Sequence, residues 1–194
     1  MSLTRQQYTL LGIFALFLGP VILVMLMRSS WWQYQPAGLK NHGQLIQPPV
    51  PLSLNVAEEI SRRWVILYVL DQTCDKACID QVTSLRQIHK AAGRKREHLS
   101  VVLLSKDQPD PSQRTALETI YPAFIWTTDN EAIALPTLDA INHKLIPDAG
   151  QANTIHTYIL DPMLNVILAY GADANPNDIH NDLKRLLKWS DQDQ

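Results

Sequence analysis

Two cysteines are the residues of this chain best suited to covalent or metal chemistry. Cys74 and Cys78 lie in the stretch "VILYVLDQTCDKACIDQV" (65–82) and are the only cysteines among the 194 residues. A disulfide between residues four positions apart closes a very short loop and therefore adds little to stability. Two thiols one helical turn apart can instead cycle between dithiol and disulfide, or bind a soft ion such as Cu(I). The spacing therefore indicates a chemical role, with two small buried hydrophobic side chains as the alternative.

The segments on either side of the cysteines predict where the pair lies in the fold. "RWVILYVL" (63–70) is a continuous apolar run with the length of a buried strand. "CIDQVTSLRQIHKAAG" (78–93) has apolar residues at helical spacing and ends at a glycine. The thiols would then lie at the amino end of a helix, where its dipole and unpaired amides favour a thiolate. We expect Cys74 to be the reactive sulfur and Cys78 to lie one turn further on, on the same helix face.

The rest of the chain completes an α/β pattern. A second buried strand is predicted at 99–105 and a short helix at 111–121. Residues 122–153 are ambiguous and are interpreted as a short strand, "AFIWTT", and a short helix, "LPTLDAINHKL". A hairpin (157–171) and an amphipathic helix (175–189) follow. A βαβ unit followed by ββα is the element order of the thioredoxin fold, so the predicted fold class is α/β and thioredoxin-like.

An apolar segment precedes this predicted domain. Residues 8–27, "YTLLGIFALFLGPVILVMLM", contain no charge and have the length of a membrane-spanning helix. "WWQY" (31–34) follows where aromatic rings settle at a membrane interface, and no cleavage site is evident after residue 27. We therefore predict one uncleaved transmembrane helix, in a single-pass protein of the cytoplasmic membrane with its soluble domain on the extracytoplasmic side.

The predicted organisation has three parts. Residues 1–30 form the membrane anchor, residues 31–57 form an extended linker rich in Pro and Gly, and residues 58–190 form the domain. A hydrophobic content of 46% with a net charge of -2 predicts a packed core and excludes a typical nucleic-acid-binding protein. The basic cluster "GRKR" (93–96) is interpreted as a solvated helix end rather than a binding patch.

A thiol pair that binds a metal ion needs a further ligand, and histidine is the candidate. His156, in "NTIHTYILDP", comes just before the predicted hairpin, in a loop that packs beside the cysteine helix in thioredoxin-like folds. A polar residue at a strand edge is the alternative interpretation of His156. His89 is expected to face water, and His143 is the second choice for the metal ligand. The remaining histidines are expected in the linker or on the surface: His42, His98 and His180.

The chain resembles the Sco/SenC proteins, a family of membrane-anchored, thioredoxin-like proteins of haem–copper oxidase assembly. The matching features are the single anchor, C-x-x-x-C after "VILYVLDQT", and "YILDPMLNVILAYG" followed by "DIHNDLKRLL". The resemblance covers roughly residues 60–189 and implies Cu(I) binding by Cys74, Cys78 and one histidine. It also implies, as partner, the copper-centre subunit of cytochrome c oxidase, which would receive copper or have its thiols reduced.

Two positions depart from the family pattern. Ile79 stands where the family usually has Pro, and the family histidine position falls on Asn153. His156 lies three residues later, and an odd shift in an extended segment reverses the face on which a side chain lies. Three functions therefore stay open: a Sco-like assembly factor, an extracytoplasmic thiol–disulfide reductase, or a structural partner of a membrane complex with incidental cysteines. We expect an assembly factor or copper chaperone rather than an enzyme.

Overall fold

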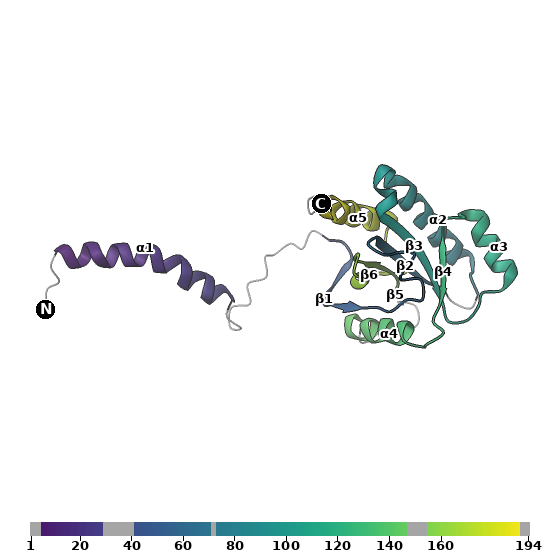
Figure 1. The fold of residues 1–194 in the computed structure, drawn as a ribbon, viewed down its shortest axis with the longest axis horizontal. Helices are drawn as coiled ribbons and strands as arrows, with labels where there is room; N and C mark the ends of the chain where they lie inside the picture. Colours follow the sequence, from purple (N-terminus) through teal and green to yellow (C-terminus); the bar gives the residue numbers. More distant parts are fainter. Residues whose placement is uncertain (1–4, 29–40, 71–72, 147–154, 191–194) are drawn as a thin grey trace. The chain divides into compact units, whose positions relative to one another are not determined.

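The computed structural model describes residues 5–28, 41–70, 73–146 and 155–190. The chain divides into two compact units, Met1–Lys40 and Asn41–Gln194, and each is described by itself. The helices are α1 (Arg5–Arg28), α2 (Lys76–Ala91), the 3-10 helix η1 (Gly93–His98), α3 (Pro111–Ile120), α4 (Ala134–Leu145) and α5 (Pro176–Ser190) (Figure 1). The strands are β1 (Gln44–Pro51), β2 (Trp64–Leu70), β3 (Leu99–Ser105), β4 (Ile125–Thr128), β5 (Ile155–Leu160) and β6 (Asn165–Gly171).

The strands form one mixed sheet in the order β1-β6-β5-β2-β3-β4. β2 is parallel to β3, in register from Trp64↔Leu99 to Leu70↔Ser105, and antiparallel to β5. β2 and β3 are buried along nearly their whole length, which explains why their sequences read as continuous apolar runs. The predicted thioredoxin-like α/β fold, with a βαβ unit followed by ββα, is confirmed.

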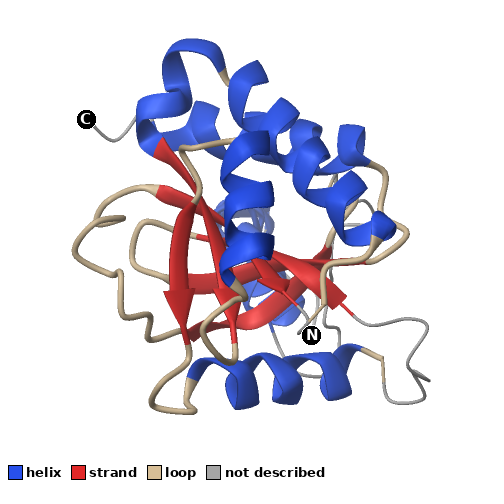
Figure 2. Ribbon diagram, turned by 90° about the vertical axis from the view of Figure 1, so that its right-hand side faces the viewer, coloured by secondary structure: helices blue, strands red, loops and turns tan. Residues whose placement is uncertain are grey.

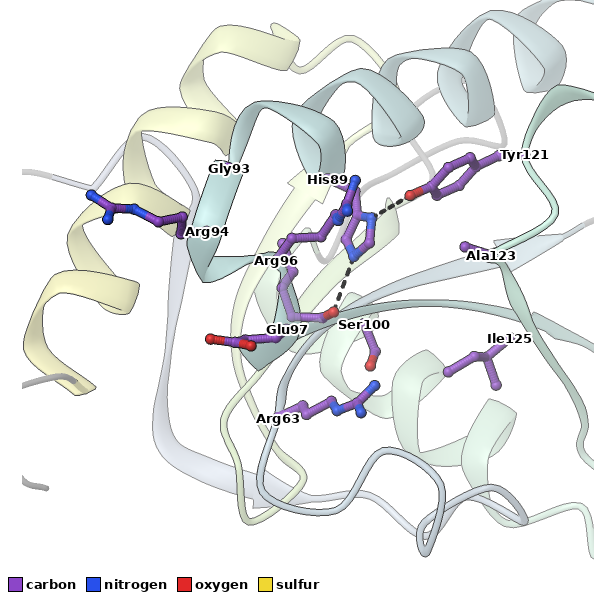
Figure 3. A pocket seen from close by; sticks show the side chains of 11 residues that line it. Arg63, His89, Gly93, Arg94, Arg96, Glu97, Ser100, Tyr121, Ala123 and Ile125 are labelled. Atoms are coloured by element: carbon purple, nitrogen blue, oxygen red, sulfur yellow. Dashed lines mark hydrogen bonds between the residues drawn. The ribbon is translucent and has the colours of Figure 1, made fainter.

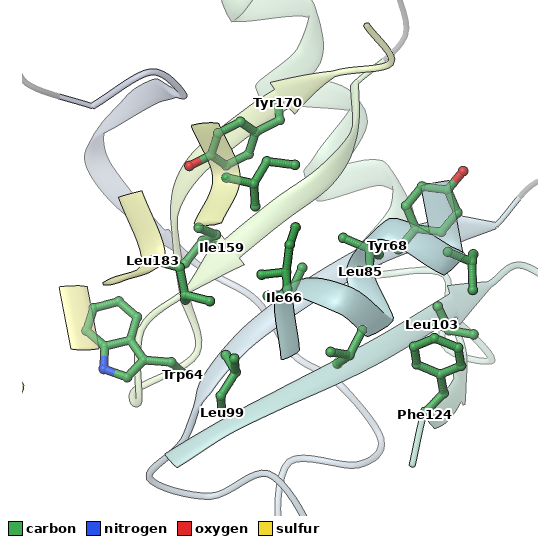
Figure 4. Close-up of a cluster of buried hydrophobic side chains, with 14 of the residues drawn as sticks. Trp64, Ile66, Tyr68, Leu85, Leu99, Leu103, Phe124, Ile159, Tyr170 and Leu183 are labelled. Carbon is green, nitrogen blue, oxygen red and sulfur yellow. The ribbon is translucent and has the colours of Figure 1, made fainter. Parts of the chain in front are cut away.

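Helices cover both faces of the sheet (Figure 2). Side chains of α2, α3 and α5 pack against one face of the sheet and form a first core with it. Side chains of α4 pack against the other face and form a second core. Along β2 the side chains alternate, with Ile66 and Tyr68 in the first core and Val65 and Leu67 in the second. Figure 4 shows part of the first core, in which Leu85 of α2 lies among strand residues.

α2 is held on the sheet by a short apolar stripe. Val82, Leu85 and Ile88 recur at helical spacing and are almost fully buried. Burial of each such side chain contributes about 1.5–3 kcal/mol to folding. Because these contacts fix the helix along its length, they also fix its amino end, where the cysteines lie.

β1 was not predicted, because it lies within the segment interpreted as a linker. It pairs with β6 at the sheet edge, first at Gln44↔Ala169 and Leu45↔Leu168, and again at Val50↔Val166 after a register shift. The prolines at 48 and 49 lie in this interruption, and an edge strand tolerates residues that cannot donate to the ladder. The compact unit that holds the sheet therefore begins at Asn41, and residues 31–40 of the predicted linker, like residues 29–30 of the predicted anchor, lie outside the described residues.

α1 covers the segment predicted as a membrane anchor. Its large apolar side chains between Ile13 and Leu26 that the structure describes are exposed. Across the described part of the chain, however, no helix is both long enough and apolar enough to cross a bilayer. The predicted transmembrane helix is therefore not confirmed.

Candidate thiol site

Cys74 and Cys78 are joined to each other by a disulfide, with their Cα atoms 5.2 Å apart. Both are half-buried, and both pack against the first core. The pair follows β2 and lies at the start of α2, as the sequence predicts. A partly exposed cysteine pair at a helix amino end suits exchange with the thiols of another protein.

Asp75 caps the helix between the two cysteines. Its Oδ1 atom accepts a hydrogen bond of 2.9 Å from the backbone amide of Cys78, and its carbonyl accepts one of 3.0 Å from Ile79. Cys74 therefore lies just outside the helix, whereas Cys78 lies within its first turn. The helix dipole and the ammonium group of Lys76 favour a thiolate here, and the carboxylate of Asp75 disfavours it.

The first two turns of α2 are also tied to the strand hairpin. The Nε2 atom of Gln81 donates a hydrogen bond of 2.8 Å to the carbonyl of Ala172, just after β6. Ile79, which follows Cys78 in the chain, is an apolar residue that is 40% exposed. The rim of the site is thus partly apolar, which suits contact with a protein surface.

A β-bulge sets the position of His156. Ile155 pairs with Gly171 and Thr157 pairs with Tyr170, so β5 has one residue more than β6 at this point. Ile155 packs in the second core, but the ring centroid of His156 lies 6.2 Å from that of Tyr68, in the first core. The extra residue reverses the side-chain alternation, so His156 lies on the sheet face that carries the disulfide.

The structure does not gather the predicted ligands into a metal site. No three His, Cys, Asp or Glu side chains of the described residues lie close enough together to hold a metal ion. The sulfurs of Cys74 and Cys78 are bonded to each other, and only free thiolates are good ligands. The disulfide form therefore does not fit Cu(I), and reduction would be needed to release two soft donors. Asn153, the family histidine position, lies outside the described residues.

His89 and His143 lie away from the thiols. The prediction that His89 faces water is wrong, because its ring is buried at the far end of α2. Its Nε2 atom lies 3.0 Å from the carbonyl of Leu99, and its Nδ1 atom lies 2.8 Å from the hydroxyl of Tyr121. A carbonyl only accepts, so Nε2 carries the proton and Nδ1 accepts from Tyr121. His143 is exposed on α4, which covers the opposite face of the sheet.

Sequence reasoning missed a buried carboxylate. Asp182 of α5 is 2% exposed and accepts hydrogen bonds from the backbone amides of His42 and Gly43 and from the hydroxyl of Tyr170. His42 is thus not a linker residue but part of the junction that closes the start of the domain onto α5. In the amphipathic pattern of α5, Asp182 lies beside the apolar stripe. The burial of Asp182 becomes evident only from its hydrogen-bond partners, which come from distant segments of the chain.

The chain matches the family described as "Transmembrane-like, thioredoxin-like, C-terminal domain" over residues 64–190. No curated protein sequence matches it. Among solved structures, apo Sco1 from Thermus thermophilus is similar with a TM-score of 0.54 and 17% identity, covering 75% of this chain and 96% of that chain. Yeast Sco1 with copper bound is similar with a TM-score of 0.52 and 15% identity, covering 75% and 92%. At these identities the similarity is one of fold.

Proposed function

Because this chain belongs to the transmembrane-like, thioredoxin-like C-terminal domain family, we propose that it is a Sco-like thiol–disulfide redox protein acting through Cys74 and Cys78. The observation that carries this proposal is the partly exposed disulfide at the amino end of α2, after the central strand β2. In a thioredoxin-like domain this is the point where a helix terminus can stabilise a thiolate.

The exchange reaction balances with the two cysteines alone. In the reduced protein the Cys74 thiolate attacks one sulfur of a partner disulfide, and the other partner sulfur leaves as a thiolate. The Cys78 thiolate then attacks Cys74, which releases the partner's second thiolate and forms the Cys74–Cys78 disulfide. The partner gains two electrons and this chain loses two, so another dithiol protein must reduce the disulfide again.

Transfer of Cu(I) is the second candidate function, with copper as cargo. It is favoured by the bulge in β5, which turns His156 to the face that carries the cysteines. After reduction, the thiolates of Cys74 and Cys78 and the imidazole of His156 form a donor set that suits Cu(I). Yeast Sco1, which has been crystallised with copper bound, shares the fold. The partner we propose for either function is the copper-centre subunit of cytochrome c oxidase.

We also propose that residues 1–30 anchor the protein in the cytoplasmic membrane. The uncharged run of residues 8–27 and the exposed apolar side chains of α1 support this proposal. The domain would then lie on the extracytoplasmic side, where disulfides persist unless a dedicated reductant acts on them.

A trapping experiment tests the exchange function. Cys78→Ser removes the resolving thiol, so membranes from cells that carry the full-length variant should accumulate a mixed disulfide through Cys74, visible on a non-reducing gel. Cys74→Ser is the matched control and should trap much less. Mass spectrometry should identify the trapped protein as the oxidase copper-centre subunit. Equal trapping by both variants would contradict the roles of Cys74 as attacking thiol and Cys78 as resolving thiol. Normal oxidase assembly in cells whose protein lacks both cysteines would leave only a structural role for the protein.

A further inference from the structure

A cavity of about 860 Å³ lies beside the end of α2 and the starts of β3 and β4 (Figure 3). Arg63 precedes β2, Ser100 lies near the start of β3, and His89 lies near the end of α2, and all three line the cavity. The cysteines, in contrast, follow the end of β2 and lie at the start of α2. The cavity is therefore separate from the thiol site.

The cavity has an excess of positive charge. Arg63, Arg94 and Arg96 line it, and none of them has an ion pair among the described residues. Glu97 is the one acidic side chain in the described lining, and it lies 3.5 Å from His98. In Figure 3 the side chain of Arg94 points away from the other lining residues. Arg63 and Arg96 are thus the cations available to an occupant.

The pKa of His89 supports the position of Arg63 and Arg96 beside the cavity. Burial lowers the pKa of His89, and the positive charges of Arg96 and Arg63 lower it further. Both guanidinium groups therefore act on the imidazole at the cavity wall. Because His89 and Tyr121 are hydrogen-bonded to each other, neither needs a partner from the cavity.

Ser100 also lines the cavity and provides an unused polar group. Its side chain is 3% exposed, and its Oγ atom has no hydrogen-bond partner among the described residues. A buried hydroxyl without a partner costs about 1–3 kcal/mol, so its presence calls for an explanation. A ligand in the cavity that accepts a hydrogen bond would provide one.

We propose that this cavity binds a phosphate ester, held by the guanidinium groups of Arg63 and Arg96 and by the hydroxyl of Ser100. Guanidinium groups match phosphate oxygens in a two-pronged geometry. The volume lies in the range of small-molecule sites, which is more than a bare phosphate ion needs. Leu99, Ala123 and Ile125 add an apolar wall for the organic part of the ester. A lipid headgroup and a soluble phosphate ester share this chemistry.

Calorimetric titration of the full-length protein in a non-ionic detergent tests the proposal, with glycerol 3-phosphate as the probe. Saturable one-to-one binding is expected at constant ionic strength. Arg63→Gln/Arg96→Gln should weaken it at least about tenfold, as expected for loss of charge-assisted hydrogen bonds. The control Lys106→Gln/Lys184→Gln removes the same charge away from the cavity and should bind like the wild type. Equal weakening in both double variants would show non-specific attraction and overturn the proposal.

Ser100→Ala gives a second, independent test. Because the hydroxyl has no hydrogen-bond partner among the described residues, its removal should not lower the melting temperature. Binding of glycerol 3-phosphate should nevertheless weaken several-fold. Unchanged affinity in this variant would remove Ser100 from the site, and no saturable binding by the wild type would overturn the whole proposal. Cys74→Ser/Cys78→Ser should bind the probe normally, so this test does not depend on the thiol function.

Bilayer nanodiscs distinguish the two sources of the phosphate group. If a lipid headgroup occupies the cavity, replacing part of the phosphatidylcholine by phosphatidylglycerol should weaken apparent probe binding to the wild type by competition. If the natural ligand is a soluble ester, probe affinity should be the same in both nanodiscs. Weakening that persists in a protein lacking Arg63 and Arg96 would show a general surface effect and contradict a headgroup site.

Discussion

The carboxylate of Asp75 accepts a hydrogen bond of 2.9 Å from the backbone amide of Cys78. The group that caps α2 therefore also places a negative charge beside the redox pair. Because this charge disfavours thiolates, it stabilises the disulfide relative to the dithiol and lowers the reduction potential of the pair.

Asp75→Asn removes the negative charge but keeps the helix cap, because Asn caps a helix about as well as Asp. We expect the reduction potential of the Cys74–Cys78 pair to rise by roughly 10–30 mV, since about 30 mV corresponds to about 1.4 kcal/mol for two electrons. Equilibration of the full-length protein with glutathione redox buffers measures this shift. Glu131→Gln, an exposed change in the loop before α4, should leave the potential unchanged. A lower potential in Asp75→Asn would show that the carboxylate acts mainly through the cap.

The position of the thiols could be predicted because the neighbouring sequence allows few alternatives. The apolar run of β2 and the stripe of Val82, Leu85 and Ile88 specify a buried strand and a packed helix, and the cysteines lie between them. β1 could not be predicted in the same way. Its prolines signal a linker, and only pairing with β6 at the sheet edge makes the segment a strand.

The histidines show the limit of sequence periodicity. A strict two-residue repeat would place His156 on the face with Tyr158, and the bulge that moves it depends on a register shift against β6. His89 lies next to the apolar stripe of α2, and its burial depends on two partners, Leu99 and Tyr121. Both outcomes depend on contacts between distant segments, which local patterns do not encode.

The position of His156 predicts a selective effect on copper. His156→Ala should weaken Cu(I) binding by the reduced protein at least about tenfold, because one of three soft or borderline donors is lost. The reduction potential of the metal-free pair should stay the same. Competition with a chromogenic Cu(I) chelator under anaerobic conditions measures the affinity. His143→Ala, on the opposite face, is the control. Equal affinities for wild type and His156→Ala would exclude His156 as a ligand, and no binding by the wild type would exclude copper as cargo.

The buried carboxylate of Asp182 predicts a large loss of stability. It accepts hydrogen bonds of 2.7 Å from the His42 amide, 2.9 Å from the Gly43 amide and 3.0 Å from the Tyr170 hydroxyl. Asp182→Ala leaves these donors without a partner, and we expect the free energy of unfolding to fall by about 3 kcal/mol or more. Urea unfolding of the full-length protein in detergent measures the change.

Asp178→Ala is the matched control for Asp182→Ala. Asp178 lies on the same helix, and its carboxylate lies 3.6 Å from the half-exposed imidazole of His42. An exposed pair of this kind contributes less than about 1 kcal/mol. Similar losses in the two variants would mean that the hydrogen bonds to Asp182 do not carry the junction between residues 42–43 and α5.

The buried ring of His89 predicts that stability depends on pH. Burial, followed by the charges of Arg96 and Arg63, holds the pKa of His89 below its ordinary value, although the hydrogen bond to Leu99 opposes the shift. As pH falls through about 6.5, the unfolded chain binds a proton at this residue before the folded protein does. The free energy of unfolding should therefore be highest above this pH and should fall below it, by at most about 1.4 kcal/mol per pH unit.

Urea unfolding above and below this pH measures the effect, and the difference between wild type and His89→Gln isolates the contribution of His89. The variant should lose less stability on acidification, whereas His98→Gln, at a half-exposed histidine, should follow the wild type. A profile for His89→Gln as steep as that of the wild type would assign the acid sensitivity to other groups.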